Sequence, residues 1–267
     1  MNQKRILSSI IWKRKEKKSW NTVLSKTGNF QKEIEKPYSY GVLWTFVFKK
    51  NFETILKMAG HIEARSILDL GCGGGWLSEW LAQRGAIPIG VDISSMFCKI
   101  SKARTKKLNT DFVCADGEHL PFKDGSFDLL ITYQSLHHCP IPGKVIEEAL
   151  RTSGRLIISD EPAQTPLLKI LKLLKILSSA KLYIGESSGI EEIRFDPQEL
   201  ELTYRSKGYR VQFKREWSFV PAILVNLETL RVIRILYESV YSILMNVKPL
   251  RNLGHGFTMM IWKPSDD

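Results

Sequence analysis

The feature that most constrains the fold of this chain is a short apolar run that ends in a cluster of glycines. The run occupies residues 66–70, and glycines follow at positions 71, 73, 74 and 75. Glycine allows a sharp turn and a close approach of the backbone to a ligand. A helix that starts directly after such a turn presents amide groups that favour negative charge. The pattern therefore predicts a buried strand, a ligand-binding turn and a helix, which together begin an open α/β sheet.

Short apolar runs alternate with amphipathic stretches along most of the remaining chain, as is typical of βα units. We expect strands at 66–70, 87–91, 112–114, 127–133, 155–159, 209–213 and 257–262. Helices are expected at 76–84, 95–107, 144–150, 167–177 and 197–208, with a helix pair within 220–247. This order predicts a doubly wound, mostly parallel seven-stranded Rossmann-like sheet of the α/β class. A helical N-terminal segment and helical insertions after the fifth and sixth strands complete the expected fold.

The glycine cluster differs from two common nucleotide-binding patterns. A dinucleotide fingerprint requires a further glycine where this chain has Trp76, and a P-loop requires a Gly-Lys-Ser/Thr sequence that is absent here. The spacing Asp69-x-Gly71-x-Gly73-x-Gly75 instead resembles the first motif of class I S-adenosylmethionine (SAM)-dependent methyltransferases. The resemblance implies SAM as the cofactor and methyl transfer as the activity.

Three further positions fit this family in the order in which it places them. Asp92 resembles the carboxylate that accepts hydrogen bonds from the two ribose hydroxyls. Asp116 resembles the acceptor for the adenine amino group, and Gln134 lies in the segment that closes over the methionine end of the cofactor. Each follows an expected strand, where an open sheet binds its ligands. The resemblance, which covers residues 62–162, implies a cofactor site formed by Asp69, Gly71, Cys72, Gly73, Gly75, Asp92, Ile93, Asp116, Gly117 and Gln134.

One turn departs from the family pattern. Members commonly have Lys/Arg-Pro-Gly-Gly before the fifth strand, where positions 151–154 of this chain read Arg-Thr-Ser-Gly. The turn lies at the far end of that strand from the glycine cluster. We therefore expect a different local geometry without loss of cofactor binding.

Two adjacent histidines are the candidates for a catalytic base. Methyl transfer from a sulfonium mainly requires alignment of the reacting atoms, and a base is needed only where the acceptor must lose a proton. His137 and His138 lie just past the fourth expected strand, and imidazole titrates near neutral pH. The other interpretation is that one histidine caps a helix or packs against the cofactor while the other is solvated. Asp160 and Glu161, after the fifth strand, are second-rank candidates for contacts with the acceptor.

The four cysteines indicate neither a metal site nor a disulfide framework. They are widely spaced, form no CxxC pair and have no accompanying set of histidines. This usage fits a reducing cytosol. The basic N-terminus lacks the apolar core of a signal peptide, and no stretch is long and uncharged enough to span a bilayer. We therefore expect a cytoplasmic protein that binds no metal.

Positive charge is concentrated in the N-terminal segment. Of the net charge of +11, residues 1–65 carry +9, residues 66–162 carry −2 and residues 163–267 carry +4. Such a segment suits phospholipid head groups, a pyrophosphate-bearing substrate or RNA, or it is a solvated arm. Amino-methylating nucleic-acid enzymes of this fold clamp a base with Asn/Asp-Pro-Pro-Tyr/Phe, whereas positions 132–135 read Thr-Tyr-Gln-Ser. The sequence therefore disfavours a nucleic-acid substrate.

The apolar segments at 167–177 and 220–247 lie where this family builds acceptor pockets, and apolar walls suit a hydrophobic acceptor. Two interpretations of these segments stay open. Either they pack into the core or a cap of the domain, or they lie on a membrane surface or line an apolar substrate cavity. We divide the chain into a basic helical N-terminal cap (1–61), a SAM-binding core (62–162), and acceptor-side insertions with the last two strands (163–267). We expect methyl transfer to oxygen or carbon of a small, hydrophobic or lipid-linked metabolite, with peripheral contact to the anionic inner face of a membrane. The alternatives are an RNA methyltransferase that uses the N-terminal segment and a non-catalytic SAM-binding partner subunit, and the oligomeric state stays open.

Overall fold

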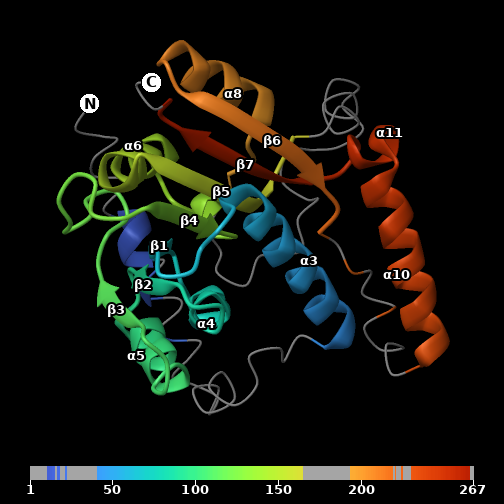
Figure 1. Ribbon diagram of the computed structural model, residues 1–267, viewed down its shortest axis with the longest axis horizontal. Helices are drawn as coiled ribbons and strands as arrows, with labels where there is room; N and C mark the ends of the chain where they lie inside the picture. The colour runs from blue at the N-terminus through green and yellow to red at the C-terminus, as the bar shows by residue number, and fades with distance from the viewer. Residues whose placement is uncertain are drawn as a thin grey trace.

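The computed structural model gives the arrangement of most of the chain (Figure 1). The helix expected at 167–177 and most of residues 220–229 lie outside the described residues. Among the helices that are described, none has the length and apolar character needed to cross a membrane. The described residues are 11–15, 17–18, 22, 41–164, 193–218, 220, 224 and 230–264.

One seven-stranded sheet forms the centre of the described structure, in the order β3-β2-β1-β4-β5-β7-β6. Neighbouring strands among the first five pair in parallel, and β7 runs antiparallel to both β5 and β6. This confirms the predicted mostly parallel sheet. The strand order reverses between β1 and β4, which opens a crevice beyond the carboxyl ends of the strands. The strands are β1 (Ser66–Leu70), β2 (Ile87–Asp92), β3 (Asp111–Cys114), β4 (Leu129–Tyr133), β5 (Arg155–Pro162), β6 (Arg210–Glu216) and β7 (Gly256–Trp262).

Helices cover both faces of the sheet (Figure 1). Successive residues of a strand point to opposite faces. Ile67 accordingly packs with the core beneath α3 and α4, and Leu68 packs with the core beneath α6. Each face therefore has its own buried core, and the strand ends are left for the crevice. The helices are α3 (Val42–Ala59), α4 (Trp76–Ala82), α5 (Ser95–Arg104), α6 (Pro142–Ser153), α8 (Pro197–Ser206), α10 (Arg231–Asn246) and α11 (Lys248–Arg251), with a 3-10 turn η1 (Leu136–His138).

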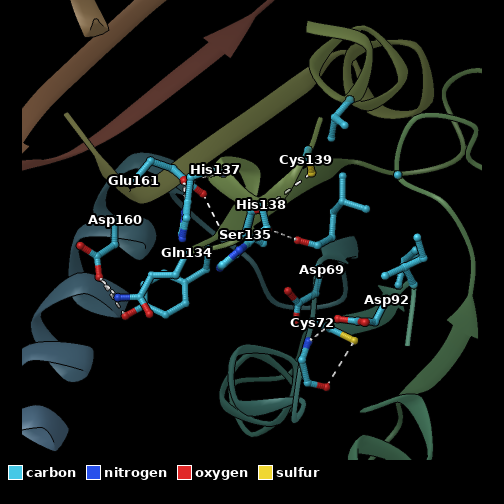
Figure 2. Close-up of a pocket in the computed structure, with 18 of the residues that line it drawn as sticks. Asp69, Cys72, Asp92, Gln134, Ser135, His137, His138, Cys139, Asp160 and Glu161 are labelled. Atoms are coloured by element: carbon cyan, nitrogen blue, oxygen red, sulfur yellow. Dashed lines mark hydrogen bonds and ion pairs between the residues drawn. The ribbon is translucent and has the colours of Figure 1, made fainter. Parts of the chain in front are cut away.

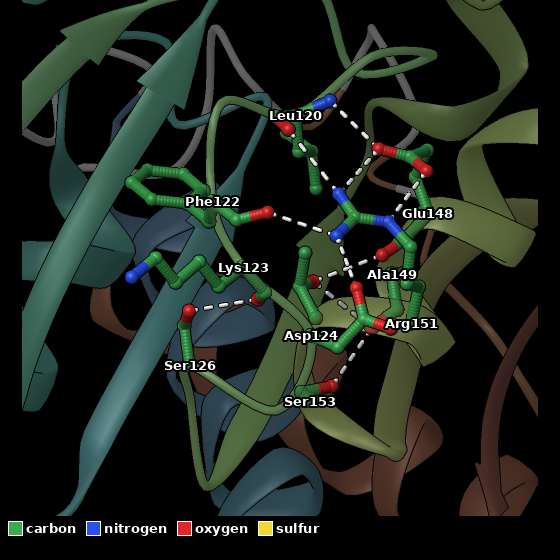
Figure 3. Close-up of polar contacts among 10 residues, drawn as sticks. Leu120, Phe122, Lys123, Asp124, Ser126, Glu148, Ala149, Arg151 and Ser153 are labelled. Carbon is green, nitrogen blue, oxygen red and sulfur yellow. Dashed lines mark hydrogen bonds and ion pairs between the residues drawn. The ribbon is translucent and has the colours of Figure 1, made fainter.

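Arg151, which precedes the two positions where the turn departs from the family pattern, holds the loop before β4. Arg151 donates through Nη1 to the Phe122 carbonyl and to the Asp124 carboxylate, each at 2.8 Å. Its Nη2 donates to the Leu120 carbonyl at 3.2 Å, and Glu148 of the same helix accepts from Nε and Nη2 at 2.8 Å (Figure 3). These charge-assisted bonds tie the loop to α6. Arg151, a position of this turn that keeps the family pattern, thus stabilises the scaffold at a distance from the crevice.

Strand β5 extends beyond its expected range of 155–159. It continues to Pro162 through Asp160, whose φ is 54°, and its register against β7 shifts between Ile158 and Glu161. Polar residues after an apolar run resemble a loop, so the pattern ends the strand too early. As a result, Asp160 and Glu161 are held on strand backbone at the edge of the crevice.

Candidate functional site

A cavity of about 690 Å³ opens at the carboxyl ends of β1, β2, β4 and β5. Its volume lies within the roughly 300–1,000 Å³ that is usual for small-molecule sites. Both candidate histidines line it, as do all the residues of the predicted cofactor site except Gly75. Figure 2 shows Asp69 and Asp92 in one group of side chains, and Gln134 and Asp160 in another. The structure therefore brings the two predicted sets of residues to one cavity.

The glycine turn has a backbone conformation that glycine adopts without strain. Gly71, Gly73 and Gly75 have φ angles of 72°, 47° and 78°. A Cβ at position 71 would overlap the Ser135 side chain, and one at position 75 would lie 2.7 Å from Cβ of Ser101. At position 73 an added Cβ would meet no atom within 4 Å, and this residue borders the cavity. Gly71 and Gly75 therefore allow the turn to pack, whereas Gly73 exposes backbone to a ligand.

Two carboxyl groups, of buried Asp69 and half-buried Asp92, stand beside this turn. Asp69 accepts from Ser78 Oγ at 2.6 Å, and burial raises its pKa to about 7. Asp92 accepts from the Gly73 N–H at 3.0 Å through Oδ2 and from the Ser94 N–H at 2.8 Å through Oδ1. Burial raises the pKa of Asp92 to about 6, although both bonds act to lower it. Each Asp92 oxygen has lone-pair capacity for a second donor, as a vicinal diol would require.

An N-terminal segment that was not predicted as part of the site contacts the cavity at Asp116. Lys13 Nζ lies 2.6 Å from Asp116 Oδ2 and 2.8 Å from Glu118 Oε2. Trp12 donates from Nε1 to the His138 carbonyl at 3.1 Å, and both N-terminal residues line the cavity. Burial acts to raise the pKa of Asp116, but the bonds from Lys13 and from the Glu118 N–H bring it below its usual value. No local pattern marks Trp12 or Lys13, because their contacts depend on the packing of a distant segment.

A second end of the cavity is built around Asp160. Its carboxylate accepts from Asn51 Nδ2 at 2.8 Å, from the Tyr133 hydroxyl at 3.3 Å and from Gln134 Nε2. Asp160 and Gln134 have φ angles of 54° and 49°, a conformation that is strained for residues other than glycine. Burial raises the pKa of Asp160 to about 6. The network thus fixes a carboxyl group that titrates near neutral pH in the wall of the cavity.

Glu161 organises the turn that follows β4. Its buried carboxylate accepts from the N–H groups of Ser135, Leu136 and His137 at 2.9, 2.7 and 3.1 Å, and lies 2.7 Å from His137 Nδ1. An ionised carboxylate only accepts, so the proton of a neutral His137 ring stands on Nδ1 and Nε2 is the accepting nitrogen. For His138, burial and the nearby His137 lower the pKa to about 4. The structure thus pairs His137 with a carboxylate that stabilises its protonated ring, and makes His138 hard to protonate.

Aromatic rings form a further wall of the cavity. Trp44 and Phe48 of α3, Trp76 of α4 and Tyr133 of β4 all line it. The Phe48 ring packs edge-on against Trp76 and Tyr133, with 5.6 and 6.2 Å between ring centres. Such a wall suits an apolar or aromatic ligand. In the part of the chain that the structure describes, no group of three or more His, Cys, Asp or Glu residues could hold a metal ion.

Glu216, at the end of β6, is a buried carboxyl group that destabilises the fold when it ionises. Burial raises its pKa to about 8, and the charge of Asp160 acts in the same direction. The stability that the fold gains by keeping Glu216 neutral is therefore fully present when the pH is below 4.5, the usual pKa of a glutamate. It is lost as the pH rises through about 8. We expect Glu216→Gln to raise the free energy of unfolding at alkaline pH by more than about 1.4 kcal/mol, the equivalent of one pKa unit, with a small effect in mild acid. Urea denaturation in both pH ranges measures this.

Glu63→Gln provides the matched control for that experiment, because it removes a carboxylate that is exposed. Equal effects of Glu216→Gln in the two pH ranges would show that the Glu216 side chain is not held in its neutral form.

Comparison with known proteins relates the central part of the chain to one family. Residues 68–158 match the family model described as "Methyltransferase domain". A ubiquinone biosynthesis O-methyltransferase of Coxiella burnetii is 36% identical over 103 residues, which are 37% of this chain and 44% of that protein. Methyltransferase GfsG of Streptomyces halstedii is 34% identical over 117 residues, 41% of each protein. The chain thus spans less than half the length of the curated relatives that it matches.

Solved structures share the fold. One is magnesium protoporphyrin IX methyltransferase from Synechocystis PCC 6803, crystallised with bound S-adenosylhomocysteine (SAH). Its TM-score is 0.57 at 16% identity, and the match covers 97% of this chain and 99% of that chain. The cyclase SpnF has a TM-score of 0.54 at 20% identity and covers 80% of each chain. At these identities the likeness establishes the fold, and the reaction has to be argued from the site.

Proposed function

We propose that this chain, whose residues 68–158 match the methyltransferase domain model, is a class I SAM-dependent methyltransferase that transfers a methyl group from SAM to a small acceptor. The observation that carries the proposal is that the glycine turn, Asp92 and Asp116 meet His137 in a single cavity. The acceptor that we favour is a hydrophobic or lipid-linked metabolite that is methylated on oxygen or carbon.

The residues around the glycine turn have the chemistry to hold SAM. Gly73 borders the cavity without a side chain, and Asp92 offers an acceptor on each oxygen for the two ribose hydroxyls. Asp116 would accept from the adenine amino group beside Lys13, and Gln134 would lie over the methionine end. When bound, SAM supplies an activated methyl group on a sulfonium. Alignment of the acceptor with that group is the main task left to the protein.

His137 is the histidine that we assign as the base. Its Nε2 would take a proton from an acceptor hydroxyl, and Glu161, 2.7 Å from Nδ1, would stabilise the imidazolium that forms. The low pKa of His138, about 4, gives that ring little tendency to accept a proton near neutral pH. Asp160, the residue before Glu161 on β5, also lines the cavity and would orient the polar group of the acceptor.

The proposed acceptor class rests on the aromatic wall and on the relatives. The rings of Trp44, Phe48 and Trp76 would pack against an apolar body and keep water from the reacting atoms. One relative is named for O-methylation in ubiquinone biosynthesis, which favours oxygen over carbon as the acceptor atom. Contacts of Trp12 and Lys13 with the cavity support the proposal that the N-terminal cap (1–61) covers the SAM-binding core (62–162).

Incubation of the full chain with methyl-labelled SAM and a fractionated cell extract tests the proposal. We expect label in the lipid or small-molecule fraction, and much less of it with His137→Ala, which leaves the glycine turn intact. Label confined to RNA or to protein would contradict the proposed acceptor class. Label confined to RNA would in addition favour the alternative of an RNA methyltransferase. SAM binding by calorimetry without label in any fraction would favour a non-catalytic subunit. Lack of heat with both SAM and SAH would overturn the methyltransferase proposal.

A further inference from the structure

The outward side of α10 carries a row of exposed apolar side chains. Their spacing, i, i+3, i+4, i+8 and i+11, places them on one side of the helix. Single exposed apolar residues are ordinary, whereas a contiguous group marks an interaction surface. We name this group the α10 apolar face; it consists of Val232, Ile235, Leu236, Val240 and Ile243, which are 66%, 49%, 57%, 54% and 55% exposed.

The opposite side of α10 anchors the helix to the molecule. Tyr237 and Tyr241 are buried and pack edge-on against Phe46 of α3, with 6.2 and 5.2 Å between ring centres. Figure 1 shows α10 at the edge of the molecule, with α3 between it and most of the sheet. The α10 apolar face is therefore directed away from both cores of the sheet.

Cationic side chains flank the α10 apolar face at both ends. Between positions 230 and 253 the chain has Arg231, Arg234, Lys248 and Arg251 against a single acidic residue, Glu238. That acidic residue lies 3.7 Å from Arg234, which leaves an excess of positive charge along the helix. Apolar residues flanked by cations are typical of a helix that lies in the plane of an anionic lipid surface.

A second copy of the chain is a less suitable occupant of the α10 apolar face. Cations stand at both ends of the helix, so two paired copies would bring like charges together in either the parallel or the antiparallel arrangement. Anionic lipid head groups would neutralise the same charges. Charge complementarity therefore favours lipid.

The helix is connected to the cavity through α3. Trp44 lines the cavity and packs in the cluster that contains Tyr237 and Tyr241. Trp217 belongs to this cluster too, and the next residue, Ser218, lines the cavity. We propose that the α10 apolar face docks on an anionic lipid surface and thereby places the aromatic wall of the cavity near it. Docking itself does not require methyl transfer, whereas the delivery of an acceptor from the lipid rests on the proposed function.

Flotation of the full chain with lipid vesicles tests the docking. Vesicles of phosphatidylcholine with phosphatidylglycerol are compared with vesicles of phosphatidylcholine alone at low salt. The double variant Leu236→Gln/Ile243→Gln removes two side chains of the face, and Leu202→Gln, at a leucine of α8 that is 69% exposed, is the matched control. We expect the unmodified chain and the control to float with anionic vesicles. The partition of the double variant should fall about tenfold or more, since burial in lipid scales with apolar area.

Three results would overturn this inference. They are lack of flotation of the unmodified chain, equal flotation of the folded double variant, and light scattering that shows a dimer dissociated by the same double variant. If circular dichroism shows that the double variant is not folded, Arg231→Gln/Lys248→Gln replaces it, with weakened flotation expected and unchanged flotation contradicting the inference. Calorimetry with SAM on the same samples separates the two proposals, because a chain that floats without binding SAM contradicts the methyltransferase function and supports the docking.

Discussion

Replacing His137 with alanine is expected to lower kcat by about 10²–10⁴-fold, the contribution typical of a positioned base, while SAM affinity stays close to that of the unmodified chain. The physical reason is the contact of 2.7 Å between His137 Nδ1 and the fully buried Glu161, which prepares the other ring nitrogen to take a proton. Single-turnover transfer of labelled methyl measures the rate, and calorimetry measures the affinity.

Two further variants make the assignment specific. His138→Ala should cost less, because a ring with a pKa of about 4 is already neutral at the working pH. Glu161 is a positioning residue, since it acts through His137. In Glu161→Gln the imidazolium loses its anionic partner, so we expect kcat to fall while the affinity for SAM stays close to that of the unmodified chain. An unchanged rate in His137→Ala would end the assignment of this residue as the base.

Asp92→Ala is expected to weaken SAM binding by about 1–3 kcal/mol, or roughly 5- to 150-fold in Kd. The loss arises because the ribose hydroxyls no longer find their acceptors. The variant also releases the N–H groups of Gly73 and Ser94, which now bond to Asp92 at 3.0 and 2.8 Å. Calorimetry with SAM and with SAH measures the change.

Asp92→Asn separates charge from shape in the same experiment. One of its oxygens becomes an amino group that faces a backbone N–H of Gly73 or Ser94, so we expect weaker binding in this variant as well. Asp111→Asn on β3 is the control, because the Asp111 side chain is 66% exposed. If the Asp92 variants bind SAM as tightly as this control, Asp92 does not contact the ribose.

The central strands were predictable because each is a short apolar run bounded by a turn signal. β1 occupies its expected range of 66–70. Helix α6, expected at 144–150, instead spans Pro142–Ser153, and its ends follow the proline in its first turn and Gly154, whose φ is 66°. Local capping residues therefore set those ends better than apolar periodicity. The end of β5 follows from neither signal, since it depends on pairing with β7 across a register shift.

The position of the glycine turn at the cavity was predictable because its residues directly follow a strand in a family motif. Lys13, Asn51 and Ser218 could not be found in the same way, although each lines the cavity or bonds to a residue that does. They come from three segments that are remote in sequence, and tertiary packing alone brings them together. Asn51 follows two lysines and therefore resembles a solvated position, yet it is fully buried.

β7 is the last of the described strands in the chain, yet it lies inside the sheet between β5 and β6. Within the described sheet, β6 has no neighbour except β7, so a nascent chain can attach β6 only together with β7 or after it. β1, which leads into the glycine turn, and its neighbours β2 and β4 leave the ribosome long before that moment. The half of the cavity that would face the adenosine of SAM can thus form early in biosynthesis, and the half that includes Ser218 and Gly256 matures when β7 is inserted.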